Sequence, residues 1–246
     1  MSKKARLAIK NYKLFFFFFL LTGYQAFSDT VAQQLATADS LYTHQKYTES
    51  FEIYEALYGQ EGVSSPATLL KMAYIKEGLG DYSNALFYLS TYFQQTLDKK
   101  ALDKIDELVL ANKLKGYNNQ NRAYIQGIAG KYRQYILGGI LLLLCIGLLF
   151  AARNVSKGKN PAFLIATMVL ILPFLFAFNF NLRNPSAIVI NDATYLMDGP
   201  SGSANVMETL SKGHKLNVKA TEGIWARVRW EDSDYYVRKS KLKEII

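Results

Sequence analysis

The side chains that most often carry catalysis or bind metals are few in this chain and lie far apart. There are two histidines, His44 and His214, and one cysteine, Cys145. Neither histidine has neighbouring residues at metal-ligand spacing, and both fall at predicted turn positions, so we expect both to be solvated. Cys145 lies inside a long apolar run. It is therefore unsuited to act as a nucleophile in water, and its position indicates a packing role.

Motifs that organise an active site are also missing from the sequence. It contains no G-x-S-x-G motif, phosphate-binding loop, H-E-x-x-H motif or dinucleotide fingerprint. One acidic group is interleaved with basic residues and predicts a solvated helix face: Asp98, Asp103, Asp106 and Glu107. These observations favour a protein that is not an enzyme, with no catalytic or metal-ligating residue and no cofactor.

Two apolar runs in the middle of the chain, residues 135–152 and 162–180, determine where the other parts lie. Each run has about the 20 residues that a helix needs to cross a bilayer, and neither contains a charge. Backbone in lipid must be helical, so the runs predict a two-helix transmembrane hairpin. The loop at 153–161 carries Arg153, Lys157 and Lys159 and no acid. The positive-inside bias places this loop in the cytoplasm and both flanking regions outside.

The N-terminal residues 1–28 are typical of a secretory signal peptide. Basic residues precede an apolar stretch at 14–21, and small residues at Ala26 and Ser28 follow it. Cleavage after Ser28 would start the mature chain at Asp29; an uncleaved anchor is the alternative. Either way, the following residues are exported, in agreement with the orientation of the hairpin. The leader holds five of the 29 basic residues, so without it the net charge falls from +9 to +4. That balance is weak support for nucleic-acid binding.

The exported region at 29–130 has apolar residues at helical spacing and an internal repeat. Ala38 pairs with Ala73, Tyr47 with Tyr82 and Ser50 with Ala85, each at an offset of 35 residues. A period close to 34 predicts helix–turn–helix units, with small residues where two helices touch and a tyrosine opening the second helix. Residues 99–115 are expected to cap the stack, and an unrelated helical bundle is the alternative.

This pattern resembles the tetratricopeptide repeat, most closely around Gly80, Asp81 and Tyr82. The first copy departs from it with Gln45 and Lys46 in the turn. In that family the first helices of the hairpins line a concave surface that binds peptides. Carried over by position, the resemblance implies partner binding by four residues: Asp39, Tyr42, Tyr74 and Glu77. Solvated side chains with no partner are the alternative for each of them.

The tail, residues 186–246, changes to short alternating strands broken by turns. Turn signals at 198–202 and 212–214 flank alternating segments at 216–220 and 225–230. Turns about every ten residues in a unit of this size predict a compact all-β barrel. In the segment at 225–230, alternation places Ala226, Val228 and Trp230 on one face and Trp225, Arg227 and Arg229 on the other.

The tail resembles bacterial SH3-like (SH3b) domains over almost its whole length. The matching residues include Gly199, Pro200, Gly213, Trp225 and the pair Tyr236-Val237. Met197 and Tyr235 depart from the pattern in regions that could shape a groove, which puts the usual ligand in doubt. Val228 matches a core position, so we expect Trp225 to be the more exposed ring. A ligand groove would then be formed by Tyr195, Trp225, Arg227 and Tyr235. The alternative is that these rings simply cover a small core.

The whole chain reads as a multidomain membrane protein: all-α tetratricopeptide-like repeats, a transmembrane hairpin and an all-β SH3-like barrel. This order resembles the membrane-anchored repeat proteins of Bacteroidetes, among them the BatE type of aerotolerance operons. The resemblance implies von Willebrand-type membrane proteins and an associated AAA-type ATPase as partners. It favours a non-catalytic scaffold in the inner membrane, with both soluble domains in the periplasm and with protein partners and a peptide or peptidoglycan as ligands. The alternatives are a stress-signalling adaptor and an accessory subunit of a cell-wall enzyme.

Overall fold

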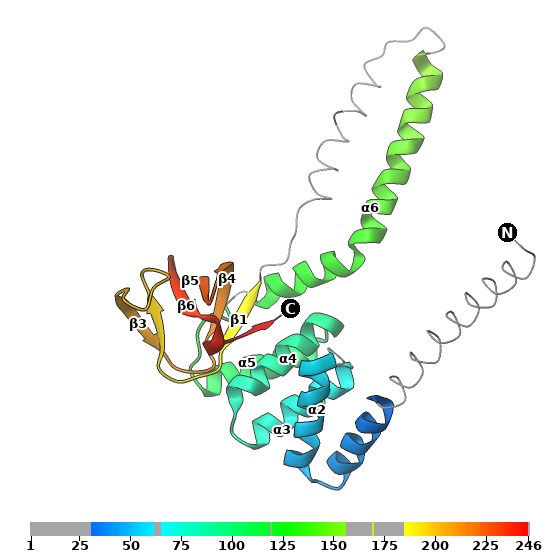
Figure 1. Ribbon diagram of the computed structural model, residues 1–246. Coiled ribbons are helices and arrows are strands. Elements are labelled where there is room, and N and C mark those ends of the chain that lie inside the picture. Colours follow the sequence, from blue (N-terminus) through cyan, green and yellow to red (C-terminus); the bar gives the residue numbers. More distant parts are fainter. Residues whose placement is uncertain (1–30, 62–64, 119, 156–168, 170–184, 246) are drawn as a thin grey trace, which may run out of the picture. The chain divides into compact units, whose positions relative to one another are not determined.

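The computed structural model describes residues 31–61, 65–118, 120–155, 169 and 185–245 (Figure 1). The predicted signal peptide at 1–28 lies outside these residues. So does the predicted second span at 162–180, apart from Val169, and so does most of the loop at 153–161. The described chain forms two compact units, one ending at Asp81 and the other running from Tyr82 to Ile246.

The described part of the first unit contains three helices: one over residues 31–43, α2 (Tyr47–Glu61) and α3 (Pro66–Gly78). Helix α3 begins where Ser65 caps it, since the Ser65 hydroxyl accepts the Thr68 N–H at 3.1 Å and Pro66 occupies the first turn. The core of the first unit is formed by large side chains that are almost completely buried, among them Tyr54, Leu69 and Met72.

The small residues of the predicted repeat are buried, as helix–helix contact requires. Ala38 and Ser50 are fully buried, and the Ser50 hydroxyl donates to the Ala38 carbonyl at 2.8 Å. Their counterparts 35 residues later, Ala73 and Ala85, are also buried. Tyr47 is the first residue of α2, and its counterpart Tyr82 is the first residue of α4 (Tyr82–Thr96). The periodic positions predicted from the sequence are therefore confirmed.

Three helices of the second unit are α4, α5 (Lys99–Ala111) and α6 (Gln120–Val155). Asp98 caps α5 by accepting the Lys100 N–H at 3.0 Å. Within the predicted acidic helix face, Glu107 accepts Lys104 at 2.9 Å. Asp98 therefore stabilises the start of α5, and Glu107 forms an ion pair within it.

Helix α6 is long, and its ribbon bends between the first turns and the apolar part (Figure 1). Its 36 residues correspond to about 54 Å at 1.5 Å per residue. Within the described residues it is the one helix long and apolar enough to cross a membrane, over Arg122–Leu149, and its apolar window is not buried. The predicted first span at 135–152 lies within α6, and Cys145 is exposed there.

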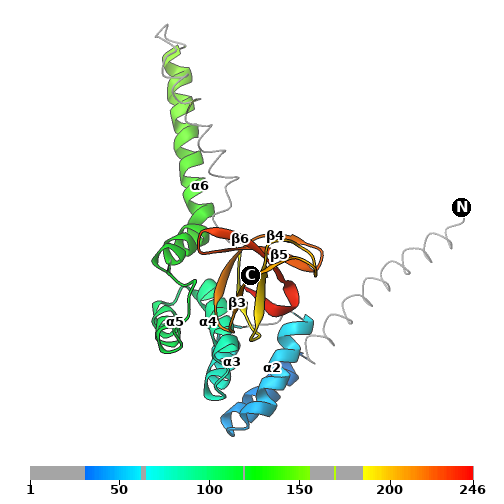
Figure 2. The same ribbon diagram turned by 90° about the vertical axis from the view of Figure 1, so that its left-hand side faces the viewer.

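Seven antiparallel strands form one sheet in the order β3-β2-β6-β5-β4-β1-β7. Their bounds are β1 (Ser186–Val189), β2 (Thr194–Met197), β3 (Val206–Leu210), β4 (Lys215–Glu222), β5 (Trp225–Trp230), β6 (Ser233–Arg238) and β7 (Leu242–Ile245), with the 3₁₀ turn η1 (Lys239–Lys241) between β6 and β7. Figure 2 shows β4, β5 and β6 side by side. The order leaves β3 and β7 as the two ends of the sheet in the described residues.

One face of the sheet carries the core of the tail. Its buried cluster includes Ala187, Leu196, Ala226, Val228 and Trp230. The Trp230 indole N–H donates to Glu208 at 2.9 Å, so the buried ring keeps its polar atom satisfied. The predicted face of β5 that contains Ala226, Val228 and Trp230 is thus confirmed.

Helix α4 packs against β1 and β7. Lys243 on β7 carries much of this contact. Its Nζ donates to the Tyr88 hydroxyl at 3.1 Å and to the Asn84 side-chain oxygen at 3.2 Å, and it lies 4.8 Å from the ring centres of Phe87 and Tyr88. A cation held over two rings is a favourable contact when partly desolvated. The unit that contains the sheet therefore begins at α4, whereas the sequence predicted a helical domain that continued to residue 130.

The linker between α5 and α6 is fastened to the start of β4. The Lys215 N–H donates to the Lys115 carbonyl at 3.1 Å, and the Tyr117 hydroxyl donates to the Gly213 carbonyl at 2.8 Å. Gly116 sits between them with φ +94°, and a Cβ there would come within 1.9 Å of the Lys215 carbonyl oxygen. Only glycine fits this close approach without a shift of the backbone.

Candidate functional site

A cluster of three tyrosines lies on the helices of the first unit. Tyr42 comes from the helix at 31–43, Tyr47 opens α2, and Tyr74 is on α3. The ring centres are 5.4 Å apart for Tyr42 and Tyr47, 6.3 Å for Tyr42 and Tyr74, and 6.0 Å for Tyr47 and Tyr74, all edge to face. Such aromatic pairs contribute about 0.5–1.5 kcal/mol beyond the burial of their area. We call these three residues the tyrosine cluster.

The tyrosine cluster is in part open to solvent. The Tyr74 side chain is 56% exposed, while Tyr42 and Tyr47 are half-buried. Burial, together with the neighbouring Tyr47 and Tyr74, raises the pKa of Tyr42. The Tyr42 hydroxyl therefore stays protonated and can donate a hydrogen bond at neutral pH.

A polar network holds the base of the cluster. The Lys71 Nζ donates to Asp39 at 2.7 Å and lies 5.4 Å from the Tyr42 ring centre. The hydroxyl of the buried Tyr54 donates to the same Asp39 oxygen. Desolvation opposes the ionised form of Asp39, but the bonds from Lys71 and Tyr54 and the charge of Lys71 outweigh it and hold its pKa below 3.8. This network ties the helix at 31–43 to α2 and α3.

The structure brings together three of the four residues predicted for the repeat surface. Asp39, Tyr42 and Tyr74 lie in one connected set, in which Asp39 anchors Lys71 and Tyr54 rather than pointing free into solvent. Glu77 follows Tyr74 by three residues on α3 and is half-buried. Tyr47 and Lys71 were missed by the sequence reasoning. Tyr47 could have been predicted from the sequence, because a tyrosine that opens the second helix must lie beside the turn.

The sheet holds the second predicted site, and strand pairing decides which residues share a face. Met197 lies opposite Tyr236, and Tyr236 lies opposite Arg227. Residues directly opposite in an antiparallel pair share a face, and alternate residues along a strand do too. Tyr195, Arg227 and Trp225 therefore lie on the face away from the core, together with Tyr236.

Tyr235 lies on the other face. It pairs with Val228 and packs against the buried core cluster. The predicted set of groove residues therefore needs a correction: Tyr235 does not share a face with Tyr195, whereas Tyr236 does. Sequence alternation signalled this, because Tyr235 precedes the core residue Val237 by two positions.

Trp225 also differs from the expectation that it would be the more exposed ring. It is only 8% exposed, and the Arg238 guanidinium lies 5.6 Å from its ring centre. Arg238 is its partner on the neighbouring strand β6, so the arginine covers the ring. Tyr195, at 52% exposure, is the accessible aromatic side chain of this face.

The arginines of β5 give this face its charge. Arg229 donates to Asp234 at 2.7 Å, which lowers the pKa of that carboxyl. The Nε atom of Arg227 is buried, and no hydrogen-bond partner for it lies in the described part of the chain. An exposed aromatic ring on a face that also carries cations suits stacking and contact with a polar ligand.

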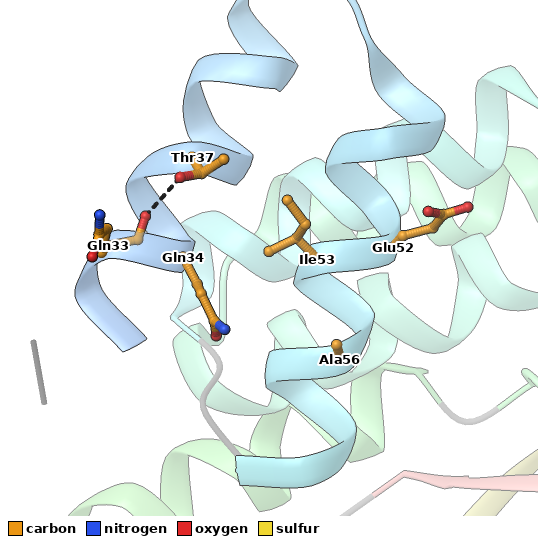
Figure 3. A pocket seen from close by; sticks show the side chains of 6 residues that line it. All are labelled: Gln33, Gln34, Thr37, Glu52, Ile53 and Ala56. Carbon is orange, nitrogen blue, oxygen red and sulfur yellow. Dashed lines mark hydrogen bonds between the residues drawn. The ribbon is translucent and has the colours of Figure 1, made fainter. Parts of the chain in front are cut away.

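A shallow hollow of about 490 Å³ lies between the helix at 31–43 and α2 (Figure 3). Its lining residues are Gln33, Gln34, Thr37, Glu52, Ile53 and Ala56. The Thr37 hydroxyl donates to the Gln33 carbonyl at 2.9 Å, so it already has a partner. The lining contains one carboxylate and no second group positioned to work with it.

Neither histidine belongs to the tyrosine cluster, the outer face of the sheet or the hollow. His44 is exposed, and its Nδ1 lies 2.8 Å from the Ser40 carbonyl. The His214 Nδ1 accepts the Lys115 N–H at 3.0 Å, and the ring meets Trp230 edge to face. In the described ranges, no group of three or more histidine, cysteine or acidic side chains is close enough to hold a metal ion.

Comparison of the chain with protein-family models, with curated proteins and with solved structures gives no match in any of the three.

Proposed function

We propose that the chain is a non-catalytic, membrane-anchored scaffold of the cell envelope that binds partner proteins through its helices. The helices from residue 31 to 96 would form tetratricopeptide-like repeats. Residues 186–246 would form an SH3-like barrel, and α6 would be the first span of a transmembrane hairpin. The bilayer would hold both binding modules close to the membrane surface.

The observation that carries this proposal is the tyrosine cluster. Tyr42 and Tyr74 belong to the first helices of the two predicted hairpins, where the repeat family binds peptides, and Tyr74 is 56% exposed. Tyrosine provides a large contact area at low entropic cost, and it is enriched at the centre of interfaces. The Asp39–Lys71 pair fixes the surrounding helices, so the surface is preorganised for binding.

The sheet supports a second, weaker binding surface. Tyr195 is exposed on the face opposite the core of the tail, which also carries Arg227 and Tyr236. An exposed aromatic side chain on a face that carries cations suits a peptide or a peptidoglycan fragment, which is the ligand class proposed for the barrel. The partner proteins would be envelope proteins of the von Willebrand type.

Site-specific photocrosslinking tests the repeat surface. In the cells that make this protein, p-benzoylphenylalanine would replace Tyr74 in the full chain and, as a matched control, Leu110 on α5, which is 77% exposed. We expect a discrete crosslinked partner from position 74 and none from position 110. The same adduct from both positions, or no adduct from position 74, would contradict a binding surface at the tyrosine cluster.

The orientation is tested by a reporter fused after Ile246 and by protease added to intact spheroplasts. A periplasmic tail would activate an export-dependent reporter and would be digested from outside. A reporter active only in the cytosol would overturn the arrangement. Hydrolysis of cell-wall fragments by the purified full chain would contradict the non-catalytic role.

A further inference from the structure

One row of side chains crosses the face of the sheet that lies away from the core cluster, which we call the outer face. Strand pairing puts Ala220 of β4 on one side of Arg227 and Tyr236 of β6 on the other (Figure 2). Residues opposite each other in antiparallel strands have Cα atoms about 4.5–5.5 Å apart, so both are direct neighbours of the arginine. The row continues to Met197 on β2 and Val206 on β3. Arg227 is thus the one cation of a row whose other members are apolar or aromatic.

The guanidinium of Arg227 is partly desolvated but not neutralised. Its Nε atom is buried, and the described residues offer its side chain neither a hydrogen bond nor an ion pair. The residue as a whole is half-buried, so the outer Nη atoms still reach solvent. A partly desolvated cation gains more from a bound anion than a fully hydrated one does, because the local dielectric constant is lower. The side chain is therefore prepared for an anion that approaches its Nη atoms.

The two other arginines that pair within this part of the outer face are already engaged. The Arg229 Nε donates to Asp234 at 2.7 Å. The Arg238 guanidinium lies over Trp225, 5.6 Å from the ring centre. Arg227 lies between these two contacts and is the arginine whose N–H groups are available to a ligand.

The charges around Arg227 favour an anion as well. The hydrogen bond from Arg229 lowers the pKa of the Asp234 carboxyl, and desolvation opposes this shift. The charges of Arg229, Arg227 and Lys219 lower that pKa further. Glu222 is the other acid among the strand partners of β5 on this face, and it lies at the last position of β4. A second carboxylate placed over Arg227 would therefore be attracted by cations that Asp234 alone does not balance.

We propose that Arg227 binds a carboxylate of an acidic peptide on the outer face of the sheet. The inference rests on the proposed function, since it names the ligand class of the second binding surface. A guanidinium donates two parallel N–H bonds to one carboxylate, which provides geometric specificity as well as attraction. Tyr236 is half-buried beside the arginine, and Val206 is 51% exposed at the end of the row. These two side chains contact the apolar neighbours of the bound acid.

A peptide carboxylate fits this row better than a phosphate polymer does. A nucleic acid or another polyphosphate is bound by several available cations along one groove. On the outer face, Arg229 is bound to Asp234, Arg238 is held over Trp225, and the remaining members of the row are uncharged. One available guanidinium among apolar side chains matches one negative charge that has apolar residues on either side.

A peptide array tests the inference with the full chain in detergent micelles. The probes are pairs of immobilised pentapeptides with blocked ends, identical except for glutamate or glutamine at the centre, and the flanking positions vary among apolar residues and lysine. We expect severalfold stronger binding of the glutamate member in pairs with apolar flanks, and we expect this preference to decline as salt is added. Arg227→Gln should remove the preference.

Two further variants separate the site from general charge and from folding. Arg122→Gln removes an arginine from an exposed position on α6 and should retain the full preference for glutamate. Arg227→Lys keeps the charge without the paired N–H groups, and it should retain only part of the preference. Exchange protection of β5 amides should be the same in both Arg227 variants as in the unmodified chain, because the side chain has no partner in the described residues to lose.

Three outcomes would overturn the carboxylate site: equal binding of the two members of each pair, a preference that survives in Arg227→Gln, or no binding of any peptide. Equal binding would leave peptide binding by the chain in place, and with it the proposed function. The proposed function fails instead when position 74 gives no crosslinked partner, a result that does not involve Arg227.

Discussion

Gln45 and Gly80 occupy equivalent turns 35 residues apart, and both have a left-handed backbone, with φ of +61° and +73°. The surrounding hydrogen bonds repeat at the same offset. The Gln45 N–H donates to Tyr42 at 3.0 Å, as that of Gly80 does to Glu77 at 2.9 Å. Lys46 donates to Leu41 at 2.9 Å, and Asp81 to Lys76 at 2.8 Å. The two turns are therefore copies of one backbone, and only one of them has the residue that this backbone favours.

The first prediction follows from this mismatch. A left-handed conformation is strained for glutamine, so Gln45→Gly should raise the local free energy of unfolding by about 0.5–1 kcal/mol. Gln45→Ala keeps the same strain and should give no gain, and Gly80→Gln should destabilise. Hydrogen exchange in the full chain measures all three, at α2 amides for the Gln45 variants and at α3 and α4 amides for Gly80→Gln. A gain from Gln45→Ala equal to that from glycine would show that the backbone strain is not the cause.

The Asp39 network predicts an acid-dependent stability of the first unit. The pKa of Asp39 is lower in the folded state than 3.8, so its stabilising effect is fully present above that pH and is lost as pH falls through the folded pKa. The effect should be below about 1 kcal/mol, because the carboxylate is half-exposed and screened. Asp39→Asn should remove this part of the pH dependence, measured by exchange of α3 amides between pH 5 and pH 2.5. Glu49→Gln, at an exposed ion pair on α2, should leave the dependence largely unchanged.

His214 predicts a second pH effect, at the junction of the linker and the sheet. Its Nδ1 accepts the Lys115 N–H, so the bond exists only while that nitrogen is unprotonated. Burial lowers the pKa of His214 below 6.5; the charge of Lys115 acts in the same direction, and the contact with the Lys115 backbone and the charge of Glu208 oppose the shift without reversing it. The contribution to stability is therefore present above pH 6.5 and declines as pH falls through the folded pKa.

The expected loss at His214 is about 1 kcal/mol, the usual net contribution of one hydrogen bond. The measurement is exchange protection of β4 amides at pH 7.5 and at pH 5, after correction for intrinsic exchange rates. His214→Gln does not titrate and should remove the difference. His44→Gln is the matched control, since His44 is the other histidine of the chain. If the difference survived in His214→Gln, the junction would not be the titrating element.

Local pattern predicted much of the fold because the forces behind it are local. The 35-residue spacing of Ala38, Ser50 and their counterparts identified the helix contacts, and alternation in β5 identified its core face. The pairing of residues on neighbouring strands was harder to predict from the sequence. The burial of Trp225 depends on Arg238, a residue that lies opposite it only once the register of β5 and β6 is set.

The packing of α4 on the sheet could not be read from the sequence. Lys243 and Tyr88 are 155 residues apart, and a lysine among aromatic rings has no periodic signature. The charges that flank the predicted spans likewise do not predict the orientation by themselves. Arg153, Lys157 and Lys159 lie in the predicted loop, but Lys131, Arg133 and Arg183 flank the predicted spans at their other ends, which the prediction places outside. The predicted orientation therefore depends on the signal peptide more than on charge bias.

The last prediction tests the two faces of the sheet with a pair of tyrosines. Tyr235 packs against the core cluster, so Tyr235→Ala should leave a cavity and cost about 2 kcal/mol in the exchange protection of β5 and β6. Tyr195 is exposed on the other face, and Tyr195→Ala should change protection by less than about 0.5 kcal/mol. The effects on ligand binding should be reversed, because a ligand of this face would contact Tyr195 and not Tyr235. Equal losses of protection in both variants would mean that the strand register does not separate these two side chains.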